Sequence, residues 1–483
     1  MPGRKNSGRN MRITWRRPIL LAAAVIWAVL LSMGSPVWAV DPPSRFGPPR
    51  APRTVDEARL RAAGIRRLAS RHLILYTDLP AEASIEALPE QFDQAVPQWI
   101  EYFKDALPRD VEADAAADNA TDTETEAPSW QAVGCLIKDK ARFVSADLLT
   151  DEVPDFLHGY SIDYEFWFNE QPSEYFRRHL MLHEGTHAFM RTRLGSTGPP
   201  WYMEGMAEYL ATHRLHDGRI ELAYFPKSRG EVPYWGRIKI IQDDVAAGKR
   251  RTLPEVFGLA PRAYLQTTPY GWSWGAATFL ASDPRYRERF RELAQAVNDP
   301  EFNQRLRDKF ADDWPLLTAQ WQAFSGELDY GYDVAAAAIE FAPGESLGDD
   351  GVKLTVDATR SWQSSKLKIE AGKTYRLKAT GRYEIARDEV DGQERIWWCE
   401  PGGVSIKYYR GRPLGQLVAA IMPDDWTGNA TKLKRTLWQP ITVGLEVELR
   451  PETTGTLYLR VNEFPGELKD NRGELKVDIK AQP

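Results

Sequence analysis

The chain has 483 residues, an overall charge of −6 and only two cysteines. Its first 39 residues hold six of the 62 basic residues and none of the acidic ones, so the remainder carries a charge of −12. A protein with this negative charge is not expected to bind nucleic acid or an anionic membrane. Two cysteines are too few for a disulfide framework. Because Cys135 and Cys399 fall in different predicted domains, we expect two free thiols.

Residues 1–39 have the pattern of a secretory signal peptide. Six basic residues precede an apolar run from Ile19 to Leu31, and the segment ends in Val37-Trp38-Ala39. A basic region, a short apolar region and a small residue at the cleavage site predict cleavage after Ala39. The apolar run is short for a transmembrane span, so an uncleaved anchor is the weaker alternative. We expect a secreted, periplasmic or cell-surface protein without stable membrane insertion after cleavage.

The region before the first motif alternates linker, helix and strand patterns. Residues 40–54 are rich in proline and arginine, which is typical of a linker. Helices are predicted at 55–69 and 83–103, and strands at 72–76 and 162–169, which predicts a small mixed sheet. Residues 110–128 carry seven acidic residues and no basic one, which indicates a solvated disordered insertion; an acidic lure for a cationic partner is the alternative.

The HEGTH motif from His183 to His187 carries the most specific chemistry of the chain. On a helix, residues four apart project from one face, so both histidines can bind one Zn²⁺. Glu184 would lie beside the metal without joining it, where it can accept a proton from water. Glu204 lies on a second apolar helical run, which can fold back antiparallel and supply a third ligand. Glu208, one turn later, faces the same side and can accept a hydrogen bond from the second ring N–H of a histidine ligand. The alternative is that Glu208 is a solvent-exposed helix residue.

The alternative is that HEGTH belongs to an ordinary amphipathic helix. Two observations favour the metal site. The residues around the motif are apolar on nearly every side, and buried histidines and glutamates are costly without partners. Six of the seven histidines also fall in this stretch, at positions 158, 179, 183, 187, 213 and 216.

The HEGTH motif, followed by WYMEGMAEY at 201–209, resembles the gluzincin clan of zinc metallopeptidases. The nearest likeness is to a bacterial, mostly exported gluzincin-like domain of uncertain function. The resemblance implies a mainly helical hydrolase domain over residues 55–330 that acts on a peptide or protein. It implies that His183, His187 and Glu204 bind zinc and that Glu184 is the general base.

The gluzincin resemblance has two further implications. In that clan a strand borders the cleft and pairs with extended substrate, and the resemblance assigns this role to residues 162–169. The alternative is that this segment is simply the last strand of a small sheet. A downstream tyrosine stabilises the oxyanion, and its spacing matches Tyr270 in a predicted turn at 268–272, although the chain has nineteen tyrosines. Helices are then predicted near 237–247, 275–281, 286–297 and 314–325.

Helical periodicity stops near residue 333, and short alternating runs follow to the end of the chain. The pattern predicts an all-β sandwich or jelly roll over 335–483, and the whole chain an α+β protein. Trp362, the run 367–372 and the run 454–473 resemble calcium-dependent galactose-binding lectins of bacterial origin.

The lectin resemblance implies a calcium site that bridges to sugar hydroxyls. It assigns Ca²⁺ ligation to Glu463, the carbonyl of Glu467, Asp470 and Asn471, and such oxygen ligands suit calcium. Glu463 is longer than the aspartate of that pattern, and the usual sugar-contacting histidine and glutamine have no counterpart. The alternative is a structural β-module whose Asx-rich turn caps a hairpin.

Together these features predict a secreted zinc-dependent hydrolase, a metallopeptidase, with a carbohydrate-binding-like C-terminal module. The alternative is a catalytically inactive, zinc-stabilised surface protein that binds carbohydrate through its β-domain. Glu184 favours the enzyme, because a purely structural zinc site has no use for a general base.

Overall fold

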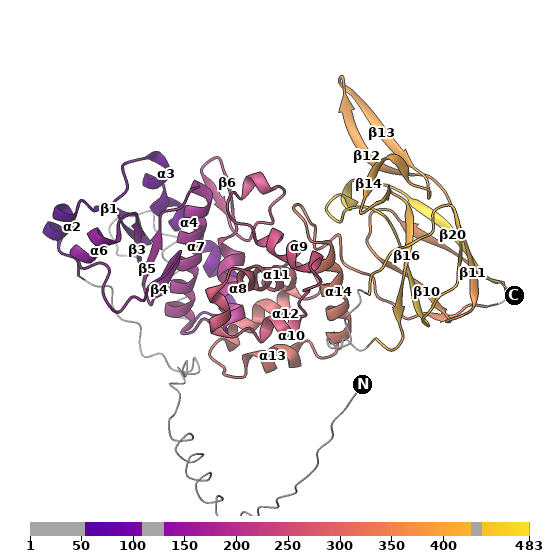
Figure 1. The fold of residues 1–483 in the computed structure, drawn as a ribbon, viewed down its shortest axis with the longest axis horizontal. Helices are drawn as coiled ribbons and strands as arrows, with labels where there is room; N and C mark the ends of the chain where they lie inside the picture. The colour runs from indigo at the N-terminus through magenta and orange to yellow at the C-terminus, as the bar shows by residue number, and fades with distance from the viewer. Residues whose placement is uncertain (1–53, 109–129, 349, 427–436, 483) are drawn as a thin grey trace, which may run out of the picture. The chain divides into compact units, whose positions relative to one another are not determined.

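The computed structural model describes residues 54–108, 130–348, 350–426 and 437–482 (Figure 1). The predicted signal peptide, nearly all of the predicted linker and the acidic insertion at 110–128 lie outside these residues. Helices and strands are both abundant, which agrees with the predicted α+β class. Cys135 and Cys399 are buried and free, so the prediction of two thiols is confirmed.

A five-stranded mixed sheet lies at the N-terminal side of the helical region. Its order is β1-β2-β3-β5-β4; β2, β3 and β5 are parallel, and the edge strands β1 and β4 are antiparallel to their neighbours. The central strand β3 is buried along its whole length, as expected of a strand covered on both faces. The strands are β1 Arg66–Ala69, β2 Leu73–Thr77, β3 Ala132–Ile137, β4 Gly159–Ile162 and β5 Glu165–Asn169.

Three predicted elements are divided in the structure. The helix predicted at 55–69 ends at Ala63, because Gly64 adopts a left-handed φ of 68° and caps it before β1. The strand predicted at 162–169 is a hairpin of β4 and β5, turned at Asp163 with φ 50°. The helix predicted at 83–103 is two helices. These first helices are α2 Glu57–Ala63, α3 Ala83–Glu86 and α4 Leu88–Phe103.

The hairpin changes which strand borders the cleft. In the described residues β4 pairs with β5 alone, so β4 forms the edge of the sheet while β5 lies inside it. The edge position expected for 162–169 therefore belongs to Gly159–Ile162. The pattern of alternation could not locate the turn, because Asp163 is an ordinary polar residue of an alternating run.

The helical region packs around one large hydrophobic core. Helix α7 begins where the hydroxyl of Ser173 accepts a hydrogen bond from the Phe176 amide at 3.1 Å, and every residue from Tyr175 to Phe189 is buried. No described helix is both long and apolar enough to cross a membrane. The remaining helices are α6 Lys140–Ser145, α7 Glu174–Phe189, α8 Pro200–Ala211, α9 Arg237–Ala246, α10 Leu253–Phe257, α11 Thr268–Ser282, α12 Arg287–Glu292, α13 Phe302–Lys309 and α14 Trp314–Glu327, with a hairpin of β6 Arg214–His216 and β7 Arg219–Glu221.

Helix α11 begins seven residues before the predicted position at Gly275. Tyr270 therefore lies in its first turn and not in the predicted irregular turn. Helix α8 packs closely on α11 because Gly205 has no side chain; an added Cβ would lie 2.7 Å from the Ser273 carbonyl oxygen. The glycine next to Glu204 thus brings Tyr270 and Glu204 to the same region.

The C-terminal region has two β-sheets around a separate core, which is the sandwich-like arrangement predicted from the sequence. One sheet has the order β17-β16-β19-β10-β8 and the other β18-β11-β20-β9. The strands are β8 Glu345–Ser346, β9 Val352–Asp357, β10 Gln363–Ile369, β11 Thr374–Thr380, β16 Leu417–Pro423, β17 Ile441–Thr442, β18 Glu446–Leu449, β19 Gly455–Val461 and β20 Glu474–Gln482, with separate hairpins β12 Tyr383–Val390 with β13 Gln393–Cys399 and β14 Val404–Tyr409 with β15 Arg412–Leu414.

Helix α14 is in contact with the β-region through buried groups. The Arg460 guanidinium of β19 donates to both carboxylate oxygens of Glu327 at 2.6 and 2.8 Å. The Trp438 indole N–H donates to the Ala319 carbonyl at 2.9 Å. Apolar side chains of both regions share one small core, and the two regions belong to one compact unit.

The packing of α8 on α11 gives a stability prediction. Gly205→Ala should lower the free energy of unfolding by about 1–3 kcal/mol, because the new methyl meets backbone that cannot move aside. Gly348→Ala is the control, since a Cβ there meets nothing within 4 Å. Urea unfolding of both variants measures the difference. Equal stability of the two variants would show that α8 and α11 are not held at this distance.

Candidate metal centre

Helices α7 and α8 run antiparallel and face each other through charged side chains. His179 pairs with Glu208, His183 with both Glu204 and Glu208, and His187 with Glu204. Residues later in α7 therefore pair with residues earlier in α8, as in two antiparallel helices. The turn between the two helices brings the HEGTH motif and the EGMAE run together. On another side of α7, Gly185 allows α4 to pack closely, since an added Cβ would lie 2.4 Å from the Phe92 ring.

Three predicted metal ligands converge on one point. Nε2 of His183 lies 3.1 Å from Nε2 of His187, and Oε2 of Glu204 lies 3.2 and 3.4 Å from these two nitrogens. In tetrahedral zinc sites with ligand bonds of ~2.0–2.1 Å, neighbouring ligand atoms lie about 3.3 Å apart. The three distances therefore match one face of a tetrahedron around Zn²⁺, with its fourth corner left for water or substrate.

The polarity of the three ligands fits a cation. Oε2 of Glu204 is buried, and its close described neighbours are the nitrogens of His183 and His187 at 3.2 and 3.4 Å; a buried carboxylate is costly unless positive charge lies near it. Burial opposes ionisation of Glu204, but the neighbouring His187 and the hydrogen bonds of both histidines outweigh it and lower the pKa of Glu204 to about 2. A carboxylate that is ionised at neutral pH beside two imidazoles is a donor set that zinc prefers.

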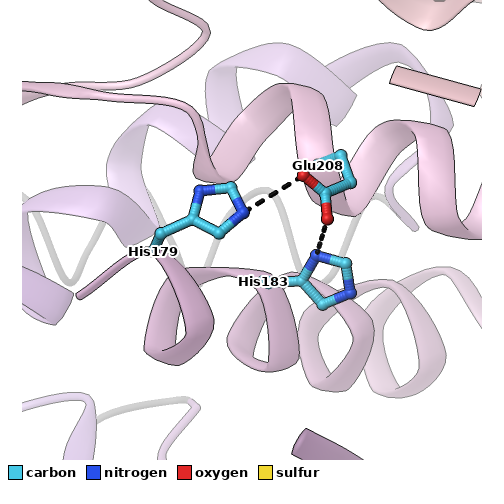
Figure 2. A group of neighbouring side chains, drawn as sticks. All are labelled: His179, His183 and Glu208. Carbon is cyan, nitrogen blue, oxygen red and sulfur yellow. Dashed lines mark hydrogen bonds and ion pairs between the residues drawn. The ribbon is translucent and has the colours of Figure 1, made fainter. Parts of the chain in front are cut away.

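Glu208 lies between His179 and the predicted ligand His183 (Figure 2). Its Oε1 lies 3.5 Å from Nδ1 of His183, close enough for an ion pair but without a hydrogen bond, while Nε2 of the same ring lies near His187 and Glu204. Its Oε2 lies 3.1 Å from Nε2 of His179. The Arg237 guanidinium of α9 donates to Oε1 at 2.6 Å. Burial would raise the pKa of Glu208, but Arg237 and His179 hold it well below its usual value.

Glu184 lies against the edge strand β4. An added Cβ on Gly159 would lie 2.3 Å from Oε1 of Glu184, so a larger residue at position 159 would force the Glu184 carboxylate to shift. The Ser161 hydroxyl donates a hydrogen bond to Glu184. Burial, and next the charge of Glu204, raise the pKa of Glu184 to about 8, despite His187 and Ser161. A cation bound at the three ligands would favour the carboxylate and oppose this rise.

The ligands open into a cleft of about 740 Å³. Tyr270 lies on its wall, with its ring centroid 6.3 Å from that of His183 and 5.5 Å from the Arg237 guanidinium. Burial, and next the carboxylates of Glu204 and Glu184, raise the pKa of Tyr270, so its hydroxyl stays protonated and can donate. The cleft is lined by Gly159, Tyr160, Ser161, Ile162, Asp163, His183, Glu184, His187, Arg191, Thr197, Met203, Glu204 and Tyr270.

Sequence reasoning missed several residues of this site. His179 lies four positions before His183, so the spacing of the histidines could have placed it on the same helix face. Gly159 and Ser161 were hidden because the cleft strand was assigned to the wrong segment. Arg237 is separated from the motif by two intervening segments, and no pattern in the sequence connects it to Glu208.

The predicted calcium ligands gather in the loop between β19 and β20. The Asn471 amide donates to Oε2 of Glu463 at 2.5 Å and to the Ala358 carbonyl at 2.9 Å, while its own Oδ1 is buried without a described partner. Burial, then Asp470 and Glu467, raise the pKa of Glu463 to about 8. In the described chain these acids do not form a group of three with all ligand atoms within 4.8 Å, so the cluster is looser than the zinc ligands.

Comparison with known proteins adds little to this geometry. No protein-family model matches the chain, and no curated protein matches it. Solved structures do match, among them the EclA N-terminal domain, described as a PllA-like lectin. That similarity has 19% identity and a TM-score of 0.20, and it covers 28% of this chain and 100% of the other. A similarity at this TM-score decides nothing about the lectin-like prediction, and it does not bear on the gluzincin resemblance.

The contacts of Glu208 predict its effect on metal affinity. Glu208→Ala should weaken zinc binding roughly 10- to 100-fold, because His183 loses the group that orients its ring, and excess zinc should restore occupancy. Glu288→Ala is the matched control, because Glu288 is an exposed helix glutamate that forms an ion pair with its neighbour Arg287 at 3.1 Å. Competition titration with a chelating dye measures both. Wild-type affinity in Glu208→Ala would remove this residue from the site.

Proposed function

We propose that this chain is a zinc-dependent hydrolase that cleaves peptide bonds. The observation that carries the proposal is the triangle of His183, His187 and Glu204, whose ligand atoms lie 3.1, 3.2 and 3.4 Å apart at the base of an open cleft. Bound there, Zn²⁺ would acidify a water molecule and polarise a carbonyl group. The signal-like segment 1–39 supports export to the cell surface, periplasm or medium.

Glu184 is the proposed general base. It lies next to a ligand on the same helix and faces the cleft, where it can accept the proton of the attacking water and pass it to the leaving amine. Ser161 and the close approach of Gly159 fix its carboxylate on one side. The protonated hydroxyl of Tyr270 is placed on the wall of the same cleft and can donate to the developing oxyanion.

Peptide is the substrate class that the cleft supports best. Residues 159–163 of the β4 edge line the cleft next to Glu184. An extended peptide can add to the free edge of β4 through backbone hydrogen bonds, which presents its carbonyl groups in a fixed register. Arg191 is the one lysine or arginine among the described residues that line the cleft, so the lining holds no basic cluster for a polyanion, which agrees with the acidic charge of the chain.

A calcium-dependent carbohydrate-binding role is proposed for the β-region. Glu463 is a buried carboxylate with no cationic side chain in hydrogen-bond contact among the described residues, and the adjacent Asn471 Oδ1 is unpaired. Both features suit an oxygen-coordinated Ca²⁺, with Asp470 and the Glu467 carbonyl as further ligands. The rival to the enzyme is a zinc-stabilised surface protein in which this β-region alone is active.

The enzyme and its rival differ in the role of Glu184. Glu184→Gln should keep about one zinc per chain while hydrolysis falls about 10²–10⁴-fold, because an amide cannot accept the proton. The measurement is metal content by mass spectrometry together with cleavage of a mixed peptide library. Glu174→Gln, an exposed position on the same helix, is the control. A wild-type chain that binds zinc yet cleaves no peptide would favour the inactive alternative.

The calcium proposal predicts a specific rise in thermal stability. Millimolar Ca²⁺ should raise the melting temperature of the mature chain, because the ion binds the native state only, and equal Mg²⁺ should raise it less. Asp470→Ala should abolish the calcium effect. Asp478→Ala, on β20 outside the loop, is the control. A melting temperature that does not change across a calcium titration would leave a β-module without a metal.

A further inference from the structure

A second cavity lies where α14 meets the β-region, away from the zinc ligands. Its volume is about 460 Å³, within the range of small-molecule binding sites. Four guanidinium groups line it, from Arg250 before α10, Arg410 and Arg412 of the β14–β15 hairpin, and Arg460 of β19. The other lining residues are Gln322, Ala323, Gly326, Glu327, Trp438, Gln439, Pro440 and Asn462.

Among the described residues, one of these four guanidiniums forms an ion pair with a carboxylate. Arg460 forms its two-pronged ion pair with Glu327. Arg250 donates to the Gln322 carbonyl at 3.0 Å, and Arg410 donates to the Gly326 carbonyl at 2.7 Å. Across the described ranges of the chain, neither of them, nor Arg412, has a carboxylate within 4.0 Å.

Arg412 binds the rim of the cavity in the same manner. It donates to the Pro440 carbonyl at 2.9 Å and to the Thr442 hydroxyl at 3.3 Å. These neutral acceptors hold the guanidiniums in place without cancelling their charge. Three positive charges therefore converge on one cavity of a chain that is otherwise acidic.

Mutual repulsion makes this arrangement costly unless an anion joins it. Burial, and next the charge of Arg410, lower the pKa of Arg250. A guanidinium keeps its proton at physiological pH, so an anion bound between these groups would lower their mutual repulsion. Planar guanidinium forks match the oxygens of phosphate and sulfate and bind them through paired charge-assisted hydrogen bonds.

We propose that this cavity binds a phosphate or sulfate group, with Arg250, Arg410 and Arg412 as its ligands. The volume is about fifteen times the ~30 Å³ that one water molecule occupies in the liquid. It therefore has room for the oxyanion as a free ion with water or as an ester on a larger polar molecule. Because its walls come from both α14 and the β-region, the bound anion would also join the two regions.

Calorimetric titration of the mature chain tests the site. Inorganic phosphate and sulfate should bind with millimolar or tighter Kd at constant ionic strength, and sodium chloride should not replace them. Arg410→Gln and Arg412→Gln should each weaken binding at least tenfold, since each removes a charged donor. Arg395→Gln is the control, an exposed arginine of β13 outside the cavity. Arg410 is itself exposed, so its variant should keep the wild-type melting temperature in anion-free buffer.

Titration with different ligands also shows whether the oxyanion is a free ion or an ester on a larger molecule. Glucose 6-phosphate that binds more tightly than inorganic phosphate, with no binding of glucose, would indicate an ester on a larger molecule. Equal affinities would indicate a free ion. Absence of binding for every anion, or binding that survives both arginine variants unchanged, would overturn the proposal and leave the arginines as ties between α14 and the β-region.

Discussion

The geometry of the candidate metal centre depends on one buried negative charge. Glu208 comes from α8, and it contacts two histidines of α7 and the arginine of α9. A buried carboxylate is stable only while such partners surround it, so the three helices must keep their relative positions. The register of α7 on α8 follows from the same contacts, and this register brings Glu204 to His183 and His187. The arrangement of the three predicted ligands is thus a consequence of how the protein surrounds the buried carboxylate of Glu208 with partners.

The glycines of the motifs show how the backbone meets this constraint. Gly185 lets the rings of α4 lie against α7, and Gly205 lets the carbonyl of Ser273 lie against α8. Gly159 does the same for the edge strand and Glu184. In each case a glycine stands directly beside a functional residue or in contact with it. Close approach of backbone, and not flexibility, is the property for which these positions need glycine.

The sequence predicted the elements whose residues repeat at the regular spacing of a helix or a strand. The four-residue spacing of His183 and His187 and the one-turn spacing of Glu204 and Glu208 are properties of a helix, so their shared faces could be foreseen. Likewise the alternating runs after residue 333 predicted strands. The hairpin at Asp163 could not be foreseen, because a single left-handed residue leaves alternation intact on both sides. Arg237 could not be predicted as part of the site, because its contact with Glu208 depends on tertiary packing alone.

The buried pair of Glu327 and Arg460 means that the β-region is not a detachable appendage. A chain cut after residue 330 would leave Glu327 without its partner and would expose the apolar side of α14, including Ala319 and Ala323. Helix α14 packs in turn on α9 and α11, which carry Arg237 and Tyr270. Gain or loss of the β-region in a related gene would therefore require compensating changes on α14, so the two regions are constrained to evolve together.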